Sequence, residues 1–396
     1  MNNTIKLAVA SALLAAASSA NAGIIIPAGD WTLDISGNVN AYYTSTRLSD
    51  NIPGSSSNTV SNITTGLLPN FMSFSGKTRE NDLDVQWLIS FNPGAAQSHS
   101  ASGGSASEHR QAYMTFGDAS WGSIKLGKDL GIYASDAILS DMTLLGVGQG
   151  AANVGTTTLG RIGAGYQYAD WKSQIAYSSP NWNGFSFTAG VTQSWNATTN
   201  LPAGFGVSST STERGGSQPA FEGKASYAWA GDVAGKVWVS GLSQKVKNVG
   251  AFGSETANAW DLGANVNVAG FGLTGVYGQG KGTGTTFLLS DGFDSVGKKR
   301  DSDDWYVQGT YTIPGVGTKL GLSYGESNLD ANAADKALGV GDYSNQMWVV
   351  GAYHPLTKHV NLVAEYSDDK QEIDIIGGGT GRAKAKTVSL GAILFF

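Results

Sequence analysis

The sequence predicts an all-β protein: a transmembrane antiparallel β-barrel, with sixteen strands as the expected number and one loop folded inside. Segments of about ten residues alternate apolar and polar side chains, as tilted membrane strands do. Short turns and long polar loops separate these segments, and the last segment ends the chain on an apolar aromatic residue. No run after residue 22 approaches the ~18 apolar residues of a membrane helix. A membrane contact would therefore use strands.

Residues 1–22 are typical of a signal peptide for export. They contain one cation at Lys6, an apolar core and a small-x-small cleavage sequence at residues 20–22. We therefore expect one mature domain over residues 23–396. The chain has no cysteine, which excludes a lipid-modified anchor and a disulfide framework. Export then leads to the periplasm or to the outer membrane, and the alternating strands favour an integral protein of the cell outer membrane.

The charge and the histidines argue against several function classes. The formal net charge is −6, and it becomes more negative once Lys6 is removed, so no nucleic-acid partner is expected. Among the four histidines, His354 and His359 are five residues apart and lack the spacing of a helical zinc pair. His109 has no well-placed Ser or Asp partner for hydrolysis. We expect no metal, no cofactor and no enzyme activity.

Period-two alternation places the strands in order along the chain. The last strand has Val388, Leu390 and Leu394 on one fully apolar side, a side that suits contact with lipid. Boundaries carry an uncertainty of a few residues, and fourteen or eighteen strands stay open. The predicted strands begin near Trp31, Leu68, Asp82, His109, Gly122, Leu159, Gly184, Glu222, Lys236, Ala257, Phe271, Asp304, Thr318, Ser344, Val360 and Ala383.

Two features of the strands bear on the surroundings of the barrel. Alternating strand directions bring five aromatic residues to the outer face at the long-loop end, as in the aromatic girdle of a membrane interface. They are Trp260, Tyr277, Trp305, Tyr324 and Tyr366. In an early strand, by contrast, Gln111, Tyr113 and Thr115 would face outward and would be a poor lipid face. This predicts a subunit contact in an oligomer, unless the inward and outward sides are reversed there.

Residues 129–157 are too apolar for an exposed loop and too long for a tight turn, so we expect them to fold against the inner wall. Around this segment the sequence resembles the general trimeric porins of Gram-negative outer membranes, and the strand number and signal peptide extend the resemblance to the whole chain. The matching stretches are residues 122–131, 135–137, 141–142, the glycines Gly146, Gly148 and Gly150, Arg161, residues 177–180, residues 184–185 and the terminal Phe396.

The resemblance implies a pore constriction, in which acids on the third loop face cations on the opposite strands. It places Arg110 and Arg161 at the basic strand positions and Asp141 at one acidic loop position; Asp136 is also in the loop, and Lys125 faces inward. Charges of both signs across a narrow gap orient dipolar solutes. The resemblance also implies a homotrimer, outer-membrane lipid and lipopolysaccharide as surroundings, and recognition of the terminal phenylalanine by the barrel-insertion machinery.

Several residues depart from the pattern of the resemblance. Leu145 and Gln149 stand where many members carry further acids, and Asn38 and Phe71 stand where relatives often carry cations. We therefore expect a weak field and a weakly selective pore that leans toward anions. Passive diffusion of small hydrophilic solutes and ions is the leading function.

Three other functions stay open from the sequence. A substrate-selective channel for organic anions or sugars would need an aromatic or basic track along the lumen, to which Trp238 and Trp348 could contribute. An adhesin would have a plugged lumen and carry no current. An outer-membrane hydrolase would depend on His109.

Overall fold

The computed structural model describes most of the mature chain. It covers residues 23–50, 58–95, 107–150, 153–154, 156–198, 218–247 and 253–396. The predicted signal peptide, residues 1–22, lies outside the described residues. Within the described ranges, none of the helices combines the length and the apolar character needed to cross a bilayer.

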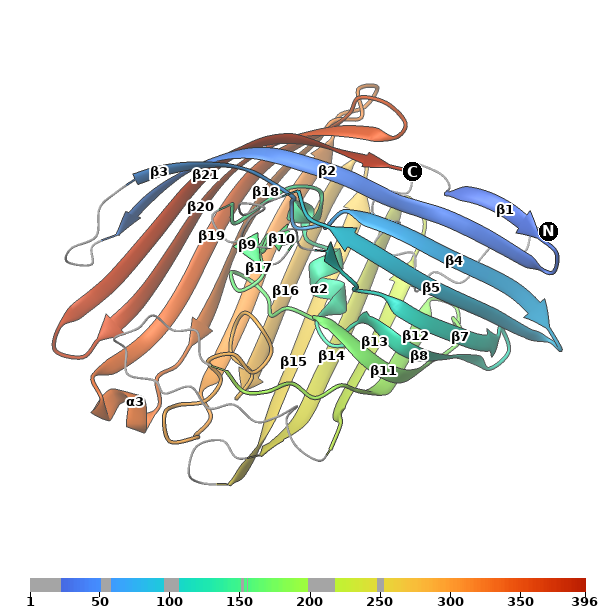
Figure 1. The fold of residues 1–396 in the computed structure, drawn as a ribbon. Coiled ribbons are helices and arrows are strands. Elements are labelled where there is room, and N and C mark those ends of the chain that lie inside the picture. Colours follow the sequence, from blue (N-terminus) through green and yellow to red (C-terminus); the bar gives the residue numbers. More distant parts are fainter. Residues whose placement is uncertain are drawn as a thin grey trace.

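The strands form one closed antiparallel barrel of 16 strands across the described residues, which confirms the predicted fold class. Each strand pairs with its sequence neighbours, and β21 (Gly379–Phe395) returns to pair with β2 (Trp31–Asp50) (Figure 1). Two barrel strands are each built from two pieces, β3 (Asn58–Thr64) with β4 (Phe71–Glu80), and β6 (Ser107–Glu108) with β7 (Ala112–Asp118). A further strand, β1 (Ile24–Ala28), pairs with the start of β2.

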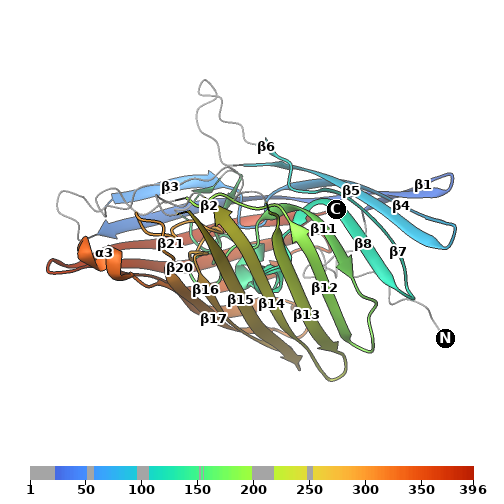
Figure 2. The same cartoon turned by 90° about the horizontal axis from the view of Figure 1, so that it is seen from below.

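Figure 2 shows β2, β4 and β5 on one side of the barrel and β13 to β17 on the other. The remaining barrel strands are β5 (Leu83–Pro93), β8 (Gly122–Leu130), β11 (Trp171–Ser178), β12 (Phe185–Thr192), β13 (Ala220–Trp229), β14 (Val233–Lys247), β15 (Ser254–Val268), β16 (Phe271–Lys281), β17 (Asp301–Thr312), β18 (Lys319–Leu329), β19 (Val340–Pro355) and β20 (Val360–Ile375). Their first residues lie within a few positions of the prediction, except for the sixth strand.

The sixth strand was predicted to begin near Leu159, and this is wrong because it begins at Trp171. The intervening residues contain Gly160, Gly163 and Gly165 with positive φ angles of 55°, 75° and 143°. The angles of Gly160 and Gly163 lie in the left-handed region, which interrupts the extended backbone of a strand. The segment between β8 and β11 is therefore longer than expected.

The connections differ in length at the two ends of the barrel, as predicted. At one end, β4 meets β5 through Asn81 and Asp82, and β15 meets β16 through Ala269 and Gly270. At the other end, residues 131–170 connect β8 to β11 and residues 282–300 connect β16 to β17. Bacterial outer-membrane barrels show the same asymmetry, with the short turns on the periplasmic side.

The five predicted outer-face aromatic residues lie on the outer face, and Trp348 joins them. The rings of Trp305 and Tyr324 are 5.4 Å apart, and those of Trp348 and Tyr366 are 5.1 Å apart. Trp260 packs against Tyr277 at 5.8 Å. Because Trp348 faces outward, it cannot line the lumen. Contact of this girdle with a membrane interface stays a prediction.

The inward and outward sides predicted for β7 are wrong. Tyr113 is only 5% exposed and faces the interior, whereas Met114 is 50% exposed. The cause is a β-bulge between β6 and β7, where the chain has one residue more than the facing stretch of β5. Gln111 is likewise buried. The polar outer face that suggested a subunit contact in this strand therefore does not exist.

The last strand closes the barrel in the way its alternation predicted. Leu390 and Val388 are exposed on the outside, whereas Ile393 and Phe395 are buried inside. Phe396 continues the pairing with Gly37: the N–H of Gly37 donates to the carbonyl of Phe396 at 2.8 Å, and the N–H of Phe396 donates back at 3.0 Å. These two bonds complete the seam between the first and last strands.

Deletion of Phe396 should lower the stability of the barrel by about 1–3 kcal/mol, because it removes two backbone hydrogen bonds at the seam. Urea unfolding of the refolded protein in detergent micelles measures this. The Phe396→Ala variant retains both backbone bonds and serves as the control. If the truncated and substituted proteins unfold at the same urea concentration, the seam bonds do not contribute as described.

A candidate constriction inside the barrel

The segment between β8 and β11, residues 131–170, folds inside the barrel and is called the inner loop below (Figure 1). It contains the helix α2 (Ser135–Leu139), the 3-10 helix η2 (Met142–Leu145) and a hairpin of β9 (Asn153–Val154) and β10 (Thr157–Thr158). It extends beyond the predicted loop, residues 129–157, by 13 residues at its end. This segment is the candidate for the constriction of a pore.

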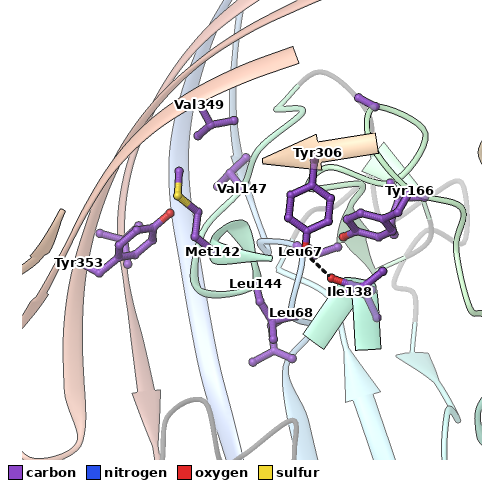
Figure 3. Close-up of a cluster of buried hydrophobic side chains, with 14 of the residues drawn as sticks. Leu67, Leu68, Ile138, Met142, Leu144, Val147, Tyr166, Tyr306, Val349 and Tyr353 are labelled. Atoms are coloured by element: carbon purple, nitrogen blue, oxygen red, sulfur yellow. Dashed lines mark hydrogen bonds between the residues drawn. The ribbon is translucent and has the colours of Figure 1, made fainter. Parts of the chain in front are cut away.

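Apolar side chains of the inner loop pack against the barrel wall, as the sequence predicted. Ile138, Leu144 and Val147 are at most 6% exposed. They belong to a cluster with wall residues that include Tyr306 (Figure 3). The hydroxyl of Tyr306 also donates to the carbonyl of Ala137 at 2.8 Å. Each buried Leu or Ile contributes roughly 1.5–3 kcal/mol, so this cluster holds the loop against the wall.

Two carboxylates of the wall hold the inner loop at widely separated points. Glu222 on β13 accepts hydrogen bonds from the backbone N–H groups of Ile132 and Tyr133 at 2.8 and 3.0 Å. Glu365 on β20 accepts from the N–H groups of Val147 and Gly148 at 2.7 and 3.0 Å. Such charge-assisted bonds are about twice as strong as neutral ones. The loop backbone is therefore attached to the barrel wall at two separate strands, β13 and β20.

Each of these two carboxylates also has a side-chain partner on the barrel wall. Glu222 forms a fully buried ion pair with Lys172 of β11. Glu365 accepts a hydrogen bond from the hydroxyl of Tyr353 at 2.6 Å. Neither Glu222 nor Glu365 was predicted from the sequence as a residue of the site. Their inward position on alternating strands was the available signal, since an inward acid opposite an apolar loop needs a partner.

Asp136 faces two lysines that were not predicted from the sequence. It forms ion pairs with Lys224 on β13, at 3.2 Å, and with Lys236 on β14. Burial alone would raise the pKa of Asp136, but the two ammonium groups outweigh it and hold the pKa below its ordinary value. The loop is thus attached to cations of the wall, in the manner that the resemblance implied but with different partners.

Asp141 has a role within the loop. Its carboxylate accepts from the N–H and the hydroxyl of Thr143 at 2.9 and 2.6 Å, which caps η2. It also accepts from the hydroxyl of Tyr166 at 2.8 Å. The carboxylate therefore fixes the conformation of the inner loop, and its bonds go to loop residues.

The cations Arg110 and Lys125 have local acidic partners. Arg110 forms an ion pair with Glu108 at 2.8 Å, and its guanidinium lies 5.7 Å from the ring of Trp171. Lys125 pairs with Asp129, four residues further along the same strand end. Glu108 and Asp129 therefore largely neutralise the charges of Arg110 and Lys125, and neither cation pairs with an acid of the inner loop in the described residues.

Arg161 lies in the inner loop and not on the strand after it, which corrects the position implied by the resemblance. The residue is fully buried, at 0% exposure. Its guanidinium donates to the carbonyls of Ala164 and Met347 at 3.1 and 2.8 Å, so it joins the loop to β19. The glycines that end strand pairing before Trp171 explain the shift. In this conformation Arg161 cannot touch a solute.

In the part of the chain that the structure describes, no group of three or more His, Cys, Asp or Glu side chains is arranged to hold a metal ion. Hydrogen bonds and ion pairs instead connect the inner loop to the barrel wall. This arrangement can narrow a lumen and place charges in it.

The chain is similar to several known proteins. The profile of a family described as Gram-negative porin matches residues 8–374. The outer membrane channel DcaP of Acinetobacter baumannii has a similar fold, with a TM-score of 0.69, 18% identity, and coverage of 95% of this chain and 100% of that chain. No curated protein matches the chain.

Two further solved structures share the fold. An anion-selective porin from Comamonas acidovorans matches with a TM-score of 0.60 and 16% identity, over 92% of this chain and 100% of that chain. The trimer form of OmpT, an outer membrane protein of Vibrio cholerae, matches with a TM-score of 0.51 and 14% identity, over 92% and 99% of the two chains.

The Glu365→Ala variant should lose about 3 kcal/mol of stability, because Val147 and Gly148 would keep buried N–H groups without an acceptor. The inner loop should also become more sensitive to proteolysis in the refolded protein. The matched control is Glu326→Ala, since Glu326 lies on the outer side of β18. Equal stability and equal cleavage of the two variants would contradict the role given to Glu365.

Proposed function

The chain belongs to the Gram-negative porin family, and we propose that it forms a water-filled pore for passive diffusion of small hydrophilic solutes and ions. One observation carries the proposal: a closed barrel with an attached inner loop has a polar inner wall beside that loop. Neighbouring strands place these polar side chains side by side in register. They are Lys236, Asn265, Thr274, Gln308 and Ser323.

The proposed selectivity is weak and favours anions. Some inward charges lie in ion pairs, such as Lys172 with Glu222, and paired charges produce little net field. Asp136 is shared by two lysines, which leaves one positive charge in excess. The side chain of Lys236 is 31% exposed, whereas Arg161 is buried. Lys236 is therefore the cation that a passing anion would meet.

The proposed surroundings follow from the outer face of the barrel. Exposed apolar side chains such as Leu273 and Leu322, 65% and 59% exposed, suit the lipid of the outer membrane. Lipopolysaccharide would contact the long loops, and Phe396 would be read by the insertion machinery after the signal peptide is removed. We also propose a homotrimer, as found in the trimer form of OmpT; β7 offers no polar patch for this contact.

A substrate-selective channel for organic anions or sugars is the second candidate function. Trp238 favours it, because this side chain faces inward and lies over Gly263. Its indole N–H has no hydrogen-bond partner among the described residues. Because Trp238 is only 4% exposed, a solute oxygen could accept from this N–H only after the side chains around it move apart.

Replacing both Lys224 and Lys236 by Ala should shift ion selectivity toward cations, because the region around Asp136 would lose two positive charges. The measurement is the reversal potential in a salt gradient across a planar bilayer. Lys358→Ala, at a short turn away from the inner loop, removes a comparable charge and should leave the potential unchanged. Strong cation selectivity in the unmodified protein would remove the proposed preference for anions.

Single-channel recording with added sugars or organic anions separates the two candidate functions. A general pore should show current reduction that rises linearly with solute concentration. A selective channel should show saturable block by one solute, and Trp238→Phe, which lacks the N–H, should weaken that block several-fold. Block by no solute at any concentration would exclude the second candidate.

A further inference from the structure

The start of β1 lies beside the seam that closes the barrel, at a place that neither the pore nor the inner loop uses. β1 pairs with residues 31–35 of β2, and β21 pairs with residues 38–50 of the same strand. Because β4 pairs with the other edge of β2 over residues 32–38, β1 and β21 follow one another along a single edge (Figure 1). The beginning of β1 therefore meets the end of β21.

Phe396 fills the last place on this edge before β1. It exchanges two backbone hydrogen bonds with Gly37, at 2.8 and 3.0 Å. In the register of β1, Gly23 lies beside Ser36, the neighbour of Gly37. An extension of β1 by one residue at its start would need the place opposite Gly37, which Phe396 already takes. With the seam closed, β1 can therefore begin no earlier than Gly23.

The carboxylate of Asp34 lies directly against Gly23. A Cβ atom placed on Gly23 would be only 1.9 Å from Oδ1 of Asp34, so only a residue without a side chain leaves room for this oxygen. The backbone nitrogen of Gly23 is roughly 2.5 Å from the same Cβ position. Oδ1 of Asp34 and the nitrogen of Gly23 are therefore at most about 4.4 Å apart.

Oδ1 of Asp34 is buried and has no hydrogen-bond partner in the ranges that the structure describes. The residues opposite Asp34 are Ser75 of β4 and Ile25 of β1, and neither carries a charge. Lys77 follows two residues after Ser75 on the same face of β4, and it does not donate to this oxygen. Because a buried carboxylate oxygen without a donor is costly, a cation beside Gly23 would stabilise Asp34.

Removal of residues 1–22 would supply that cation. The cut turns the amide nitrogen of Gly23 into an α-ammonium group that can donate hydrogen bonds. This step is the predicted export cleavage, so the inference rests on the proposed function. We propose that the α-ammonium group of Gly23 forms an ion pair with the carboxylate of Asp34 and thereby holds β1 against the seam. Hydrogen bonds between charged groups are roughly twice as strong as those between neutral groups.

The ion pair links removal of the signal peptide to closure of the barrel. An uncut chain offers Asp34 one uncharged N–H group, and an extension of β1 competes with Phe396 for the place opposite Gly37. The cut chain offers Asp34 a charged group and leaves that place to Phe396. Cleavage before Gly23 and closure of the seam therefore favour each other.

Acylation of the amino terminus tests the ion pair. The protein is exported with its own signal peptide and purified from outer membranes in detergent, and mass spectrometry should show that it starts at Gly23. An amine held as an ammonium ion reacts slowly. Acetic anhydride at about pH 8, near the ordinary pKa of an α-amino group, should therefore modify Gly23 several-fold more slowly in the unmodified protein than in Asp34→Asn. Asp30→Asn removes an exposed carboxylate from the turn after β1 and should react as the unmodified protein does.

Hydrogen exchange of β1 is the second measurement. Asn has nearly the shape of Asp, so the Asp34→Asn barrel should fold, but the backbone N–H groups of residues 24–28 should exchange several-fold faster than in Asp30→Asn. A start other than Gly23, or equal acylation and equal exchange in the three proteins, would overturn the inference. Absence of channel current in the unmodified protein would instead contradict the proposed pore and would leave the acylation and exchange results unchanged.

Discussion

The pairing of β2 with β21 is the constraint on which the rest of the structure depends. Backbone groups inside a hydrocarbon layer need partners within the protein, so a sheet there has to close. Asn38 to Asp50 pair with the last strand along its length, and Gly37 and Phe396 extend the seam by two bonds. Once the barrel is closed, successive side chains of each strand point alternately to the outside and to the inside of the barrel. The outer face is largely apolar, and the inner face carries the polar residues together with apolar ones such as Ile393 that belong to the cluster around the inner loop.

The inner loop lies inside the closed barrel. The loop is apolar enough to bury itself, yet its backbone still needs hydrogen-bond partners. Glu222 and Glu365, which lie on different strands of the barrel wall, accept hydrogen bonds from this backbone. The ion pairs of Asp136 add a third attachment. Lys236 belongs to this third attachment, and its side chain is still 31% exposed. In the proposed pore, this lysine would therefore contribute both to holding the loop and to selectivity.

Alternation in the sequence was enough to predict the barrel, the outer aromatic face and the closing strand, because period two reports directly on inside and outside. It failed at Tyr113, where a bulge adds one residue, and at Arg161, where glycines delay the next strand. Pairing partners such as Lys224 and Lys236 are far from Asp136 in sequence. These lysines come close to Asp136 only when the strands have paired and the inner loop has folded inside the barrel. A local sequence pattern could therefore not identify the two lysines.

The central claim is that a loop-narrowed, water-filled passage remains through the closed barrel. Single-channel recording of the refolded mature chain in a planar lipid bilayer tests it most directly. The account predicts discrete, stable current steps that rise linearly with voltage in simple salt. Barrels that insert into the bilayer, resist protease and yet carry no current would contradict it.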